Sequence, residues 1–530
     1  MRTFMWAESI TDSDFSDFMF KLINSPNHVR SKVVPKIAEP VIFVCLPNSF
    51  RADWGMTLRA TLLLTTIGLC LATVAENKIP FNLLVIQTDE HHFKTLGCYG
   101  GEIVPTPHLD WIAQNGAKAT SFYATTPVCS PSRAALMSGR FPQHTPVTNN
   151  NIPLDAKIVT FAEVLRKRGY ATGYAGKWHL DGEGKPQWAP KRKFGFTDNR
   201  FMFNRGHWKK FEDTKTGPRV SARRGGRPFY GLAGADEKSF STDWLTDKVI
   251  GFVNENKKKP FCYMVSYPDP HGPNTVRAPY DEMFAKVKVP IPRSLAKTRE
   301  QTPAWAAKAP RITADTVRVL MPKYYGMVKC LDDNVGRILA ALRANGQLAR
   351  TVIVFTSDHG DLCGEHGRLN KGVPYEGSAR IPFLVYCPGQ IKGGTVVNEA
   401  LSCVDFFPMV MALLGVKHGQ PVDGRDASGL FTGAGGKWED ITFLRSTSNP
   451  RQAWLCAVSD RYKLVYASAG KPWLFDLAKD PDELTNLFND PRHRDIVRKM
   501  TAALAAYCKR ENDPYADQPQ IKAAMAAVLE

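Results

Sequence analysis

The stretch around which the chain is organised runs from Thr126 to Gly139 and reads TPVCSPSRAALMSG. Cys129 stands at the predicted start of a short helix, with Pro131 two residues later and Arg133 one helical turn away. The first amides of a helix carry partial positive charge, and the guanidinium adds a full charge near the sulfur. The pattern indicates a site for anionic chemistry, although a buried cysteine near a proline is also common as a structural residue.

The longer string CSPSRAALMSGR, from Cys129 to Arg140, is far more specific. It resembles the signature of the formylglycine-dependent (type I) sulfatases, which belong to the alkaline phosphatase-like superfamily. The resemblance implies that Cys129 is oxidised after synthesis to 3-oxoalanine (formylglycine) and acts as a hydrated aldehyde, not as a thiol. It also implies a maturation partner, namely a formylglycine-generating enzyme or its anaerobic equivalent.

The composition is that of a large globular protein with a basic surface. With 530 residues, of which 43% are hydrophobic and 23% charged, the chain is long enough to bury a large core. The net charge of +18 favours an acidic partner such as nucleic acid, anionic lipid or a sulfated or phosphorylated substrate, although basic surfaces can also be passive. No zinc-finger spacing, RNA-binding aromatic signature or sustained basic helix occurs in the sequence, so we do not expect nucleic acid as a partner.

The beginning of the chain differs from the rest. Residues 1–55 show no sustained helical or strand period, and no function is assigned to them. Met56 opens a segment with a positive residue at Arg59, an apolar run from Ala60 to Ala75 and small residues at its end, which is typical of a secretory signal peptide. We therefore expect translation to start at Met56, residues 56–75 to be cleaved, and the protein to be exported to the periplasm or secreted. Because the run is short for a membrane span, no stable span is expected after cleavage; an uncleaved anchor or a buried core helix are the alternatives.

The cysteines do not predict a disulfide framework. Of the 11 in the sequence, nine follow residue 75, and eight of these remain when Cys129 is set aside. Their spacing is wide and irregular, and no two stand in a Cys-x-x-Cys pair. Their pairing is therefore left open.

A near-continuous apolar run from Phe81 to Thr88 is typical of a central strand that is buried on both faces. It ends in Asp89 and Glu90, two carboxylates that would repel each other unless they share a cation, although Asp89 could instead cap a turn. In the sulfatases that the chain resembles, this strand typically ends in two aspartates that bind a metal ion. The resemblance implies Asp89 as a metal ligand, whereas Glu90, the second candidate, keeps the charge but adds a methylene.

Three further predicted strands also end in polar clusters that contain an acid, a histidine or a lysine. The strands and their clusters are 170–175 with Lys177 and His179, 261–267 with His271, and 351–357 with Asp358 and His359. Because ligands bind beyond the carboxyl ends of parallel strands, we expect these side chains to converge at one edge of the sheet. Taken singly, a Lys-x-His pair is common on surfaces and a histidine between prolines is common in turns.

The segments Gly176–His179 and Lys371–Glu376 match two further sulfatase motifs, Gly-Lys-Trp-His and Lys-Gly-x-x-Tyr-Glu. The resemblance implies one metal ion, and an oxygen-rich ligand set favours Ca²⁺. The implied ligands are Asp89, Glu90, Cys129, Asp358 and His359. The implied catalytic residues are Cys129 as the nucleophile, Arg133, Lys177 and Lys371 as cations that neutralise the sulfate, His271 as the acid for the leaving alcohol, and His179 as the base for the aldehyde hydrate.

Strands that alternate with helices predict an α/β fold with a large, mostly parallel sheet flanked by helices, in the alkaline phosphatase-like arrangement, and a smaller C-terminal α+β subdomain with an antiparallel sheet. We expect the catalytic domain at 76–435 and the subdomain at 436–530. Within the subdomain, the pattern predicts a hairpin at 453–466 and a final helix at 492–508.

The predicted elements of the catalytic domain include two helices with clear boundary signals and one long loop. A capping box predicts a helix at 160–169, and an apolar stripe followed by a glycine predicts a long helix at 320–345. Residues 185–236 are rich in glycine, proline, basic and aromatic residues and are predicted to form a loop, either a substrate-binding excursion or an ordinary surface insertion.

These observations predict a sulfuric ester hydrolase that resembles the arylsulfatases. The positive charge and the long loop favour a sulfated carbohydrate over a small aryl ester as the substrate. Two alternatives stay open: the same site could hydrolyse phosphonate or phosphate esters, or the protein could bind sulfated glycans without catalysis if Cys129 is never oxidised.

Overall fold

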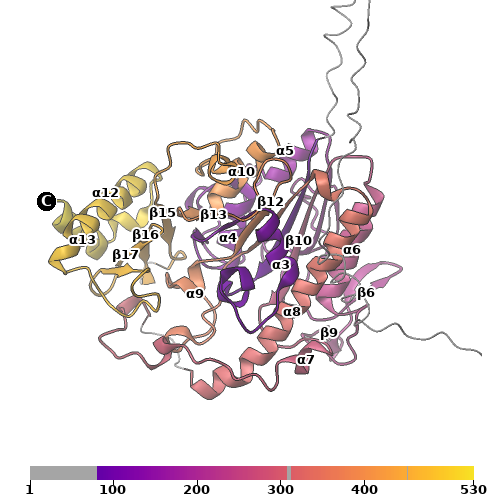
Figure 1. Ribbon diagram of the computed structural model, residues 1–530, viewed down its shortest axis with the longest axis horizontal. Helices are drawn as coiled ribbons and strands as arrows, with labels where there is room; N and C mark the ends of the chain where they lie inside the picture. The colour runs from indigo at the N-terminus through magenta and orange to yellow at the C-terminus, as the bar shows by residue number, and fades with distance from the viewer. Residues whose placement is uncertain (1–79, 307–311, 450–451) are drawn as a thin grey trace, which may run out of the picture. The chain divides into compact units, whose positions relative to one another are not determined.

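An eight-stranded sheet, in which one strand runs antiparallel to both of its neighbours, organises the protein (Figure 1). Its spatial order is β13 (Thr395–Val397), β2 (Ala117–Ala119), β12 (Phe383–Tyr386), β11 (Thr351–Ser357), β1 (Asn82–Asp89), β10 (Phe261–Pro270), β4 (Ala171–Lys177) and β5 (Asp198–Phe203). The antiparallel strand is β12, and the other neighbouring pairs are parallel. The predicted large, mostly parallel sheet is therefore confirmed.

The computed structural model describes residues 80–306, 312–449 and 452–530. The predictions for residues 1–55 and for a signal peptide at 56–75 lie outside the described residues. The described residues form one compact unit. This does not test the predicted boundary near residue 436, which stays a prediction.

Helices cover both faces of the sheet, and the central strand β1 contributes side chains to both cores. Leu83 and Val85 pack with α4 (Cys129–Ser138), α5 (Phe161–Lys167) and α10 (Cys403–Leu413). Leu84 and Ile86 point to the other face, where they pack with α3 (Pro107–Asn115), α6 (Ser241–Glu255) and α8 (Ala314–Ala344). Successive strand residues alternate between faces, and each such buried side chain contributes roughly 1.5–3 kcal/mol to stability. This explains why the strand is apolar along its whole length.

Side-chain hydrogen bonds cap the amino ends of two helices, α5 and α8. At α5 the predicted capping box is present: the Glu163 amide donates to Thr160 Oγ1 at 3.2 Å, and the Thr160 amide donates to Glu163 Oε2 at 2.9 Å. The predicted start of α8 at residue 320 was wrong, because the helix begins at Ala314, where the Thr313 side chain accepts from the Thr316 amide. Residues 314–319 bury one apolar side chain, that of Val317, so the sequence pattern marked only the more strongly amphipathic part.

The prediction of a loop at 185–236 was wrong in part, because the segment contains the edge strand β5 and two short hairpins. The hairpin strands are β6 (Phe211–Thr214) with β7 (Gly217–Val220) and β8 (Arg223–Arg224) with β9 (Arg227–Pro228). The β8–β9 turn consists of Gly225 and Gly226, both with positive φ, a conformation that favours glycine. The strands are too short and too polar to show a clear period in the sequence.

The C-terminal region forms an antiparallel sheet, as predicted, with two helices beside it. The strands are β15 (Thr442–Arg445), β16 (Trp454–Val458), β17 (Tyr462–Ala467) and β18 (Trp473–Asp476). The predicted final helix is α12 (Arg494–Arg510), and α13 (Pro519–Leu529) was not predicted; both lie beside this sheet, in yellow in Figure 1. Leu464 and Leu504 belong to the same buried cluster as Leu83, so this region shares a core with the large sheet.

Short elements complete the described fold. They are β3 (Phe122–Tyr123), which pairs with β14 (Leu401–Ser402), and the helices α7 (Tyr280–Met283), α9 (Glu376–Ala379) and α11 (Ser428–Thr432). The nine cysteines in the described part of the chain are all free thiols. Within residues 80–306, 312–449 and 452–530, no helix combines the length and the apolar character that a bilayer crossing needs.

Candidate active site

The four strands that end in polar clusters are neighbours in the sheet. In the order β11, β1, β10 and β4 they run parallel, so their carboxyl ends lie at one edge. Asp358 follows β11, Asp89 ends β1, His271 follows β10 and Lys177 ends β4. The structure brings all four side chains together around the start of α4, at the position where parallel sheets bind their ligands.

Cys129 is the first residue of α4 and is buried among these strand ends. Its Sγ lies 3.2 Å from His359 Nε2, and Lys177 Nζ lies 3.6 Å from the same sulfur. The helix ends at Ser138 and is followed by Gly139, which has a φ of 69° and whose amide donates to Ala135 O. The short helix thus presents its amino end, with Cys129 in the first turn, to the polar edge of the sheet.

Four buried side chains, which we name the cation group, could hold a metal ion: Asp89, Cys129, Asp358 and His359. One ligand atom from each lies within 4.8 Å of the others. Asp89 Oδ1 is buried and has no hydrogen-bond partner among the described residues. His359 Nδ1 donates to Gly360 O at 2.9 Å, which leaves Nε2 to face the group, as in histidines that bind metals. The donor set therefore fits a divalent cation.

Arg133 holds the two carboxylates of the cation group in place. Its Nε donates to Asp358 Oδ2 at 2.9 Å and its Nη2 to Asp89 Oδ2 at 3.2 Å. Its Nη1 donates to Lys177 O at 2.8 Å and to Ser266 Oγ at 2.7 Å. Since the nitrogens of this buried guanidinium bind protein groups, the structure places Arg133 behind the site and not at its open side.

Glu90 lies outside the cation group. Its Oε2 is 2.9 Å from His271 Nε2, and its Oε1 is 3.0 Å from Lys371 Nζ. The residue has a φ of 62°, an uncommon conformation for a non-glycine residue. In this structure the candidate ligand Glu90 therefore pairs with Lys371 and lies beside His271, two candidate catalytic residues.

Two lysine–histidine pairs line the site. Lys371 Nζ donates to His271 Nε2 at 2.8 Å, and Lys177 Nζ, which also contacts Asp89, donates to His207 Nε2 at 2.9 Å. The His207 and His271 rings stack with centroids 3.4 Å apart and planes inclined by 8°. Sequence reasoning missed His207, because it stands alone between Gly206 and Trp208 with no informative spacing.

The remaining predicted site residue, His179, lies beside Cys129 at the end of β4. Its Nε2 is 3.0 Å from Asn151 Oδ1, and its carbonyl accepts from Ser130 Oγ at 2.7 Å. Burial lowers the pKa of His179, and the neighbouring Cys129 opposes this shift. The structure thus holds an imidazole next to the candidate nucleophile.

Burial and charge together set the pKa values at the site. Burial raises the pKa of the Cys129 thiol, but Lys177, Lys371 and His359 lower it, and the pKa lies well below its usual value. Burial also raises the pKa of Glu90, whereas His271 and Lys371 lower it, with a net result of about 2. The site therefore strongly favours the anionic forms of groups placed in it.

The open side of the site is formed by the two histidines and Lys371. The side chains of His207, His271 and Lys371 are 20%, 15% and 16% exposed, whereas those of Asp89 and Lys177 are fully buried. An incoming anion would therefore meet the stacked histidines and Lys371 before it reaches Cys129. This arrangement suits a substrate whose negative group enters first.

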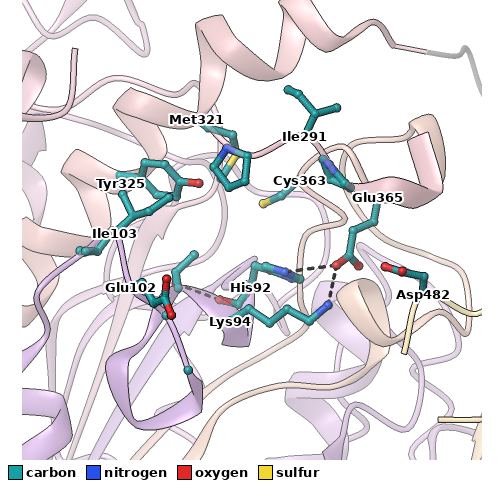
Figure 2. Close-up of a pocket in the computed structure, with 16 residues that line it drawn as sticks. His92, Lys94, Glu102, Ile103, Ile291, Met321, Tyr325, Cys363, Glu365 and Asp482 are labelled. Atoms are coloured by element: carbon teal, nitrogen blue, oxygen red, sulfur yellow. Dashed lines mark hydrogen bonds and ion pairs between the residues drawn. The ribbon is translucent and has the colours of Figure 1, made fainter. Parts of the chain in front are cut away.

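A separate cavity of about 340 Å³ lies elsewhere on the protein, and residues of the cation group do not line it (Figure 2). Its walls carry the carboxylates of Glu102, Glu365 and Asp482, and Lys94 Nζ binds Glu365 Oε1 at 2.9 Å. Tyr325 contributes to an apolar wall. Three carboxylates against one lysine would repel an anion, so this cavity is unsuited to a sulfate group.

The chain is similar in sequence to known sulfatases. The family model described as Sulfatase matches residues 81–416, and the model of the N-sulphoglucosamine sulphohydrolase C-terminal region matches residues 364–510. The uncharacterized sulfatase YidJ of Escherichia coli is 28% identical over 457 residues, which cover 82% of this chain and 88% of the relative. The N-acetylglucosamine-6-O-sulfatase of Bacteroides thetaiotaomicron is 27% identical and is matched over 86% of this chain and 92% of its own length.

Solved structures share the fold. The yidJ protein of Bacteroides fragilis has a TM-score of 0.70 and 28% identity, with coverage of 84% of this chain and 99% of that chain. A phosphonate monoester hydrolase of Agrobacterium radiobacter has a TM-score of 0.67 at 24% identity, covers 81% of this chain and 96% of its own, and shows a likeness of fold. The predicted α/β fold with its C-terminal antiparallel sheet is thus confirmed. Because the Sulfatase model spans more than half of the sequence and fits the arrangement around Cys129, the chain belongs to the sulfatase family.

Proposed function

We propose that this enzyme hydrolyses sulfate esters of a carbohydrate, with Cys129 acting after its oxidation to formylglycine. One observation carries the proposal: Cys129 lies between the other members of the cation group and Lys177, with His359 Nε2 at 3.2 Å and Lys177 Nζ at 3.6 Å from its sulfur. A nucleophile that attacks an anionic sulfur needs both activation and positive charge beside it.

Asp89, Asp358 and His359, with the modified side chain at position 129, would hold one divalent cation. Carboxylate-rich sets favour Ca²⁺ over transition metals. Glu90 joins this set only if it leaves His271 and Lys371. The formylglycine hydrate supplies a geminal diol as the nucleophile, and the bound cation favours loss of a proton from that diol.

The side chains of this protein divide the remaining work. Lys177 and Lys371 flank the position of the sulfate and offset charge that develops on its oxygens, while Arg133 keeps Asp89 and Asp358 oriented. His271, on the open side, protonates the oxygen of the leaving alcohol, and His179 takes a proton from the diol.

A sulfated carbohydrate is favoured as the substrate by the segment 185–236. It contains thirteen lysines and arginines against four aspartates and glutamates. The resulting charge of +9 is half of the chain's net charge of +18. Arg223, Arg224 and Arg227 are exposed on the β8–β9 hairpin, and the nearby Tyr230 ring lies 6.3 Å from that of His207. A basic, partly aromatic surface next to the site suits a sugar chain that carries further acidic groups. The N-acetylglucosamine-6-O-sulfatase relative supports the same substrate class.

We also propose that the protein is exported, since residues 56–75 have the features of a signal peptide. Amino-terminal sequencing of the secreted or periplasmic protein tests this. A mature terminus shortly after Ala75 supports the proposal, and a terminus upstream of Met56 contradicts it.

The proposed activity is tested by sulfate release from a panel of sulfated sugars, together with 4-nitrophenyl sulfate, and by mass spectrometry of the peptide that contains Cys129. Release of sulfate and an aldehyde at position 129 support the proposal. A higher rate with aryl phosphonate than with aryl sulfate would instead indicate a phosphonate hydrolase. An intact thiol with tight glycan binding and no turnover would indicate a binding protein.

A further inference from the structure

The two carboxylates at the end of β1 each begin a similar chain of contacts. Asp89 contacts Lys177, whose Nζ donates to His207 Nε2 at 2.9 Å. Glu90 lies 3.0 Å from Lys371, whose Nζ donates to His271 Nε2 at 2.8 Å. The two chains meet where the imidazoles stack at 3.4 Å. A contact network of this kind links both candidate sulfate-binding lysines through the two rings.

A second metal site does not explain this arrangement. Asp89, His207 and His271 do place one potential ligand atom each within 4.8 Å of the others. However, Nε2 of each imidazole already accepts from a lysine ammonium, which can only donate. Two ammonium groups at this position would repel a cation. His207 therefore acts here as a hydrogen-bond acceptor for Lys177, and both rings act as flat packing surfaces.

Hydrogen bonding to His207 restrains Lys177. An ammonium group on a flexible four-carbon stem has three rotatable donors, and a fixed acceptor directs them. With one N–H on His207 Nε2 and another on Asp89, the third is directed by elimination toward the sulfur of Cys129, 3.6 Å away. The acceptor at position 207 thus sets where Lys177 presents its charge.

Stacking on His207 restrains His271. A histidine ring can rotate about its terminal torsion, and a parallel ring at 3.4 Å blocks that rotation on one face. The segment that carries His207 also holds the His271 backbone. Two residues later, the buried Lys209 Nζ donates to His271 O at 3.2 Å and to Asp269 Oδ1 at 2.5 Å. Residues 207 and 209 therefore fix both the ring and the main chain of His271.

We propose that His207 is a positioning residue for sulfate-ester cleavage, which aims Lys177 at the nucleophile and His271 at the leaving oxygen. The inference rests on the proposed function. It assigns two separable tasks to one side chain: hydrogen-bond acceptance from Lys177 and ring packing against His271. Each task can be removed while the other is kept.

The experiment compares His207→Phe with His207→Gln. Phenylalanine keeps a flat ring on His271 but cannot accept from Lys177, whereas glutamine offers an oxygen near the position of Nε2 but has no ring. Two substrates separate the effects: 4-nitrophenyl sulfate has a good leaving group that needs no protonation, and a sulfated sugar has a poor one that requires an acid.

We expect His207→Phe to lower kcat by about 10- to 100-fold with both substrates, as a misplaced catalytic group does. We expect His207→Gln to lower kcat at least about 10-fold with the sugar sulfate but to leave 4-nitrophenyl sulfate within about threefold of wild type, because only leaving-group protonation is disturbed. A merely structural role would lower both rates in both variants by the same factor. That result, or wild-type kcat and KM in both variants, would overturn the inference.

Controls keep the outcomes distinct. His418→Phe and His418→Gln make the same substitutions at a histidine of a surface loop and should leave both rates unchanged. Thermal unfolding and the aldehyde content at position 129 are measured for each variant.

If the wild-type protein cleaves none of the substrates, the proposed function fails, and the affinity for inorganic sulfate then decides the inference. This affinity should weaken in His207→Phe and recover in His207→Gln. Unchanged affinity in His207→Phe would refute it.

Discussion

Cys129 Sγ and His359 Nε2 lie 3.2 Å apart, although the two residues are 230 positions apart in the chain. The first belongs to the amino end of α4, and the second follows the carboxyl end of β11. A helix start supplies partial positive charge and a strand end supplies side chains from a fixed backbone. Their meeting point is therefore the place where the proposed nucleophile and cation act together.

Replacement of Cys129 by alanine is expected to abolish sulfate release and leave the fold intact. Alanine is a good helix former, so α4 should persist, but no aldehyde can form at this position. Sulfate release and thermal unfolding are the measurements. Cys262→Ala, which truncates a buried cysteine on β10, is the matched control and should cost about 1–2 kcal/mol in stability while turnover persists. Normal turnover in Cys129→Ala would end the proposal.

Calcium is expected to stabilise the wild-type protein and not Asp358→Asn. The cation group gathers buried carboxylates, so a bound ion should raise the free energy of unfolding, by about 2.7 kcal/mol at a hundred times Kd. Thermal unfolding with Ca²⁺ and with a chelator measures the effect. Glu282→Gln removes an exposed carboxylate and should respond to calcium like wild type. An equal response in Asp358→Asn would place the ion elsewhere.

Charge reversal on the β8–β9 hairpin is expected to weaken polymer recognition without slowing the chemistry. Arg224→Glu with Arg227→Glu should raise KM for a polysulfated polysaccharide about 10-fold or more, and the effect should shrink as salt screens it. KM and kcat for 4-nitrophenyl sulfate should not change. Reversal of the exposed Lys499 and Lys509 on α12 gives the same change in net charge at another surface. Equal effects of the two pairs would argue against a specific binding surface.

His144 is expected to stabilise the protein under acidic but not alkaline conditions. Its hydrogen bond to Asp423, at 2.7 Å, raises its pKa above the ordinary value of 6.5, although burial opposes this shift. Since the folded pKa is the higher one, the stabilisation is fully present below pH 6.5 and is lost as the pH rises through the folded pKa. Urea unfolding of His144→Gln and wild type, from acidic to alkaline pH, should show a stability gap that closes as the pH rises. A gap that widens with pH would contradict this.

Lys463→Met is expected to destabilise the protein by about 3–5 kcal/mol, because it removes the cation shared by two buried carboxylates and leaves Glu376 with Arg380 alone. Lys463 Nζ lies 2.7 Å from Glu376 and 2.9 Å from Glu483, and it donates to Pro374 O at 2.7 Å. Denaturant unfolding measures the loss. Removal of one charge in the double variant Lys463→Met, Glu483→Gln should recover part of the stability, and no recovery would show that the carboxylates are not the cause.

Much of the fold could be predicted because hydrophobic period and capping are local. The apolar run of β1, the capping box at Thr160 and the C-terminal hairpin each depend on a few neighbouring residues. The helix α13 was missed, as were the short hairpins of residues 211–228, because short or weakly patterned segments gain their structure from packing against neighbours.

The sequence by itself determined the order of the strands along the chain, the residue at the end of each one and the motif around Cys129. It could therefore indicate that Asp89, Lys177, His271 and Asp358 meet. Only the tertiary structure decided which side chain faces which: Arg133 binds the carboxylates from behind, Glu90 pairs with Lys371, and His207 stacks on His271. These partners come from segments far apart in the chain, and no local period or spacing specifies which of several nearby charges and rings will touch.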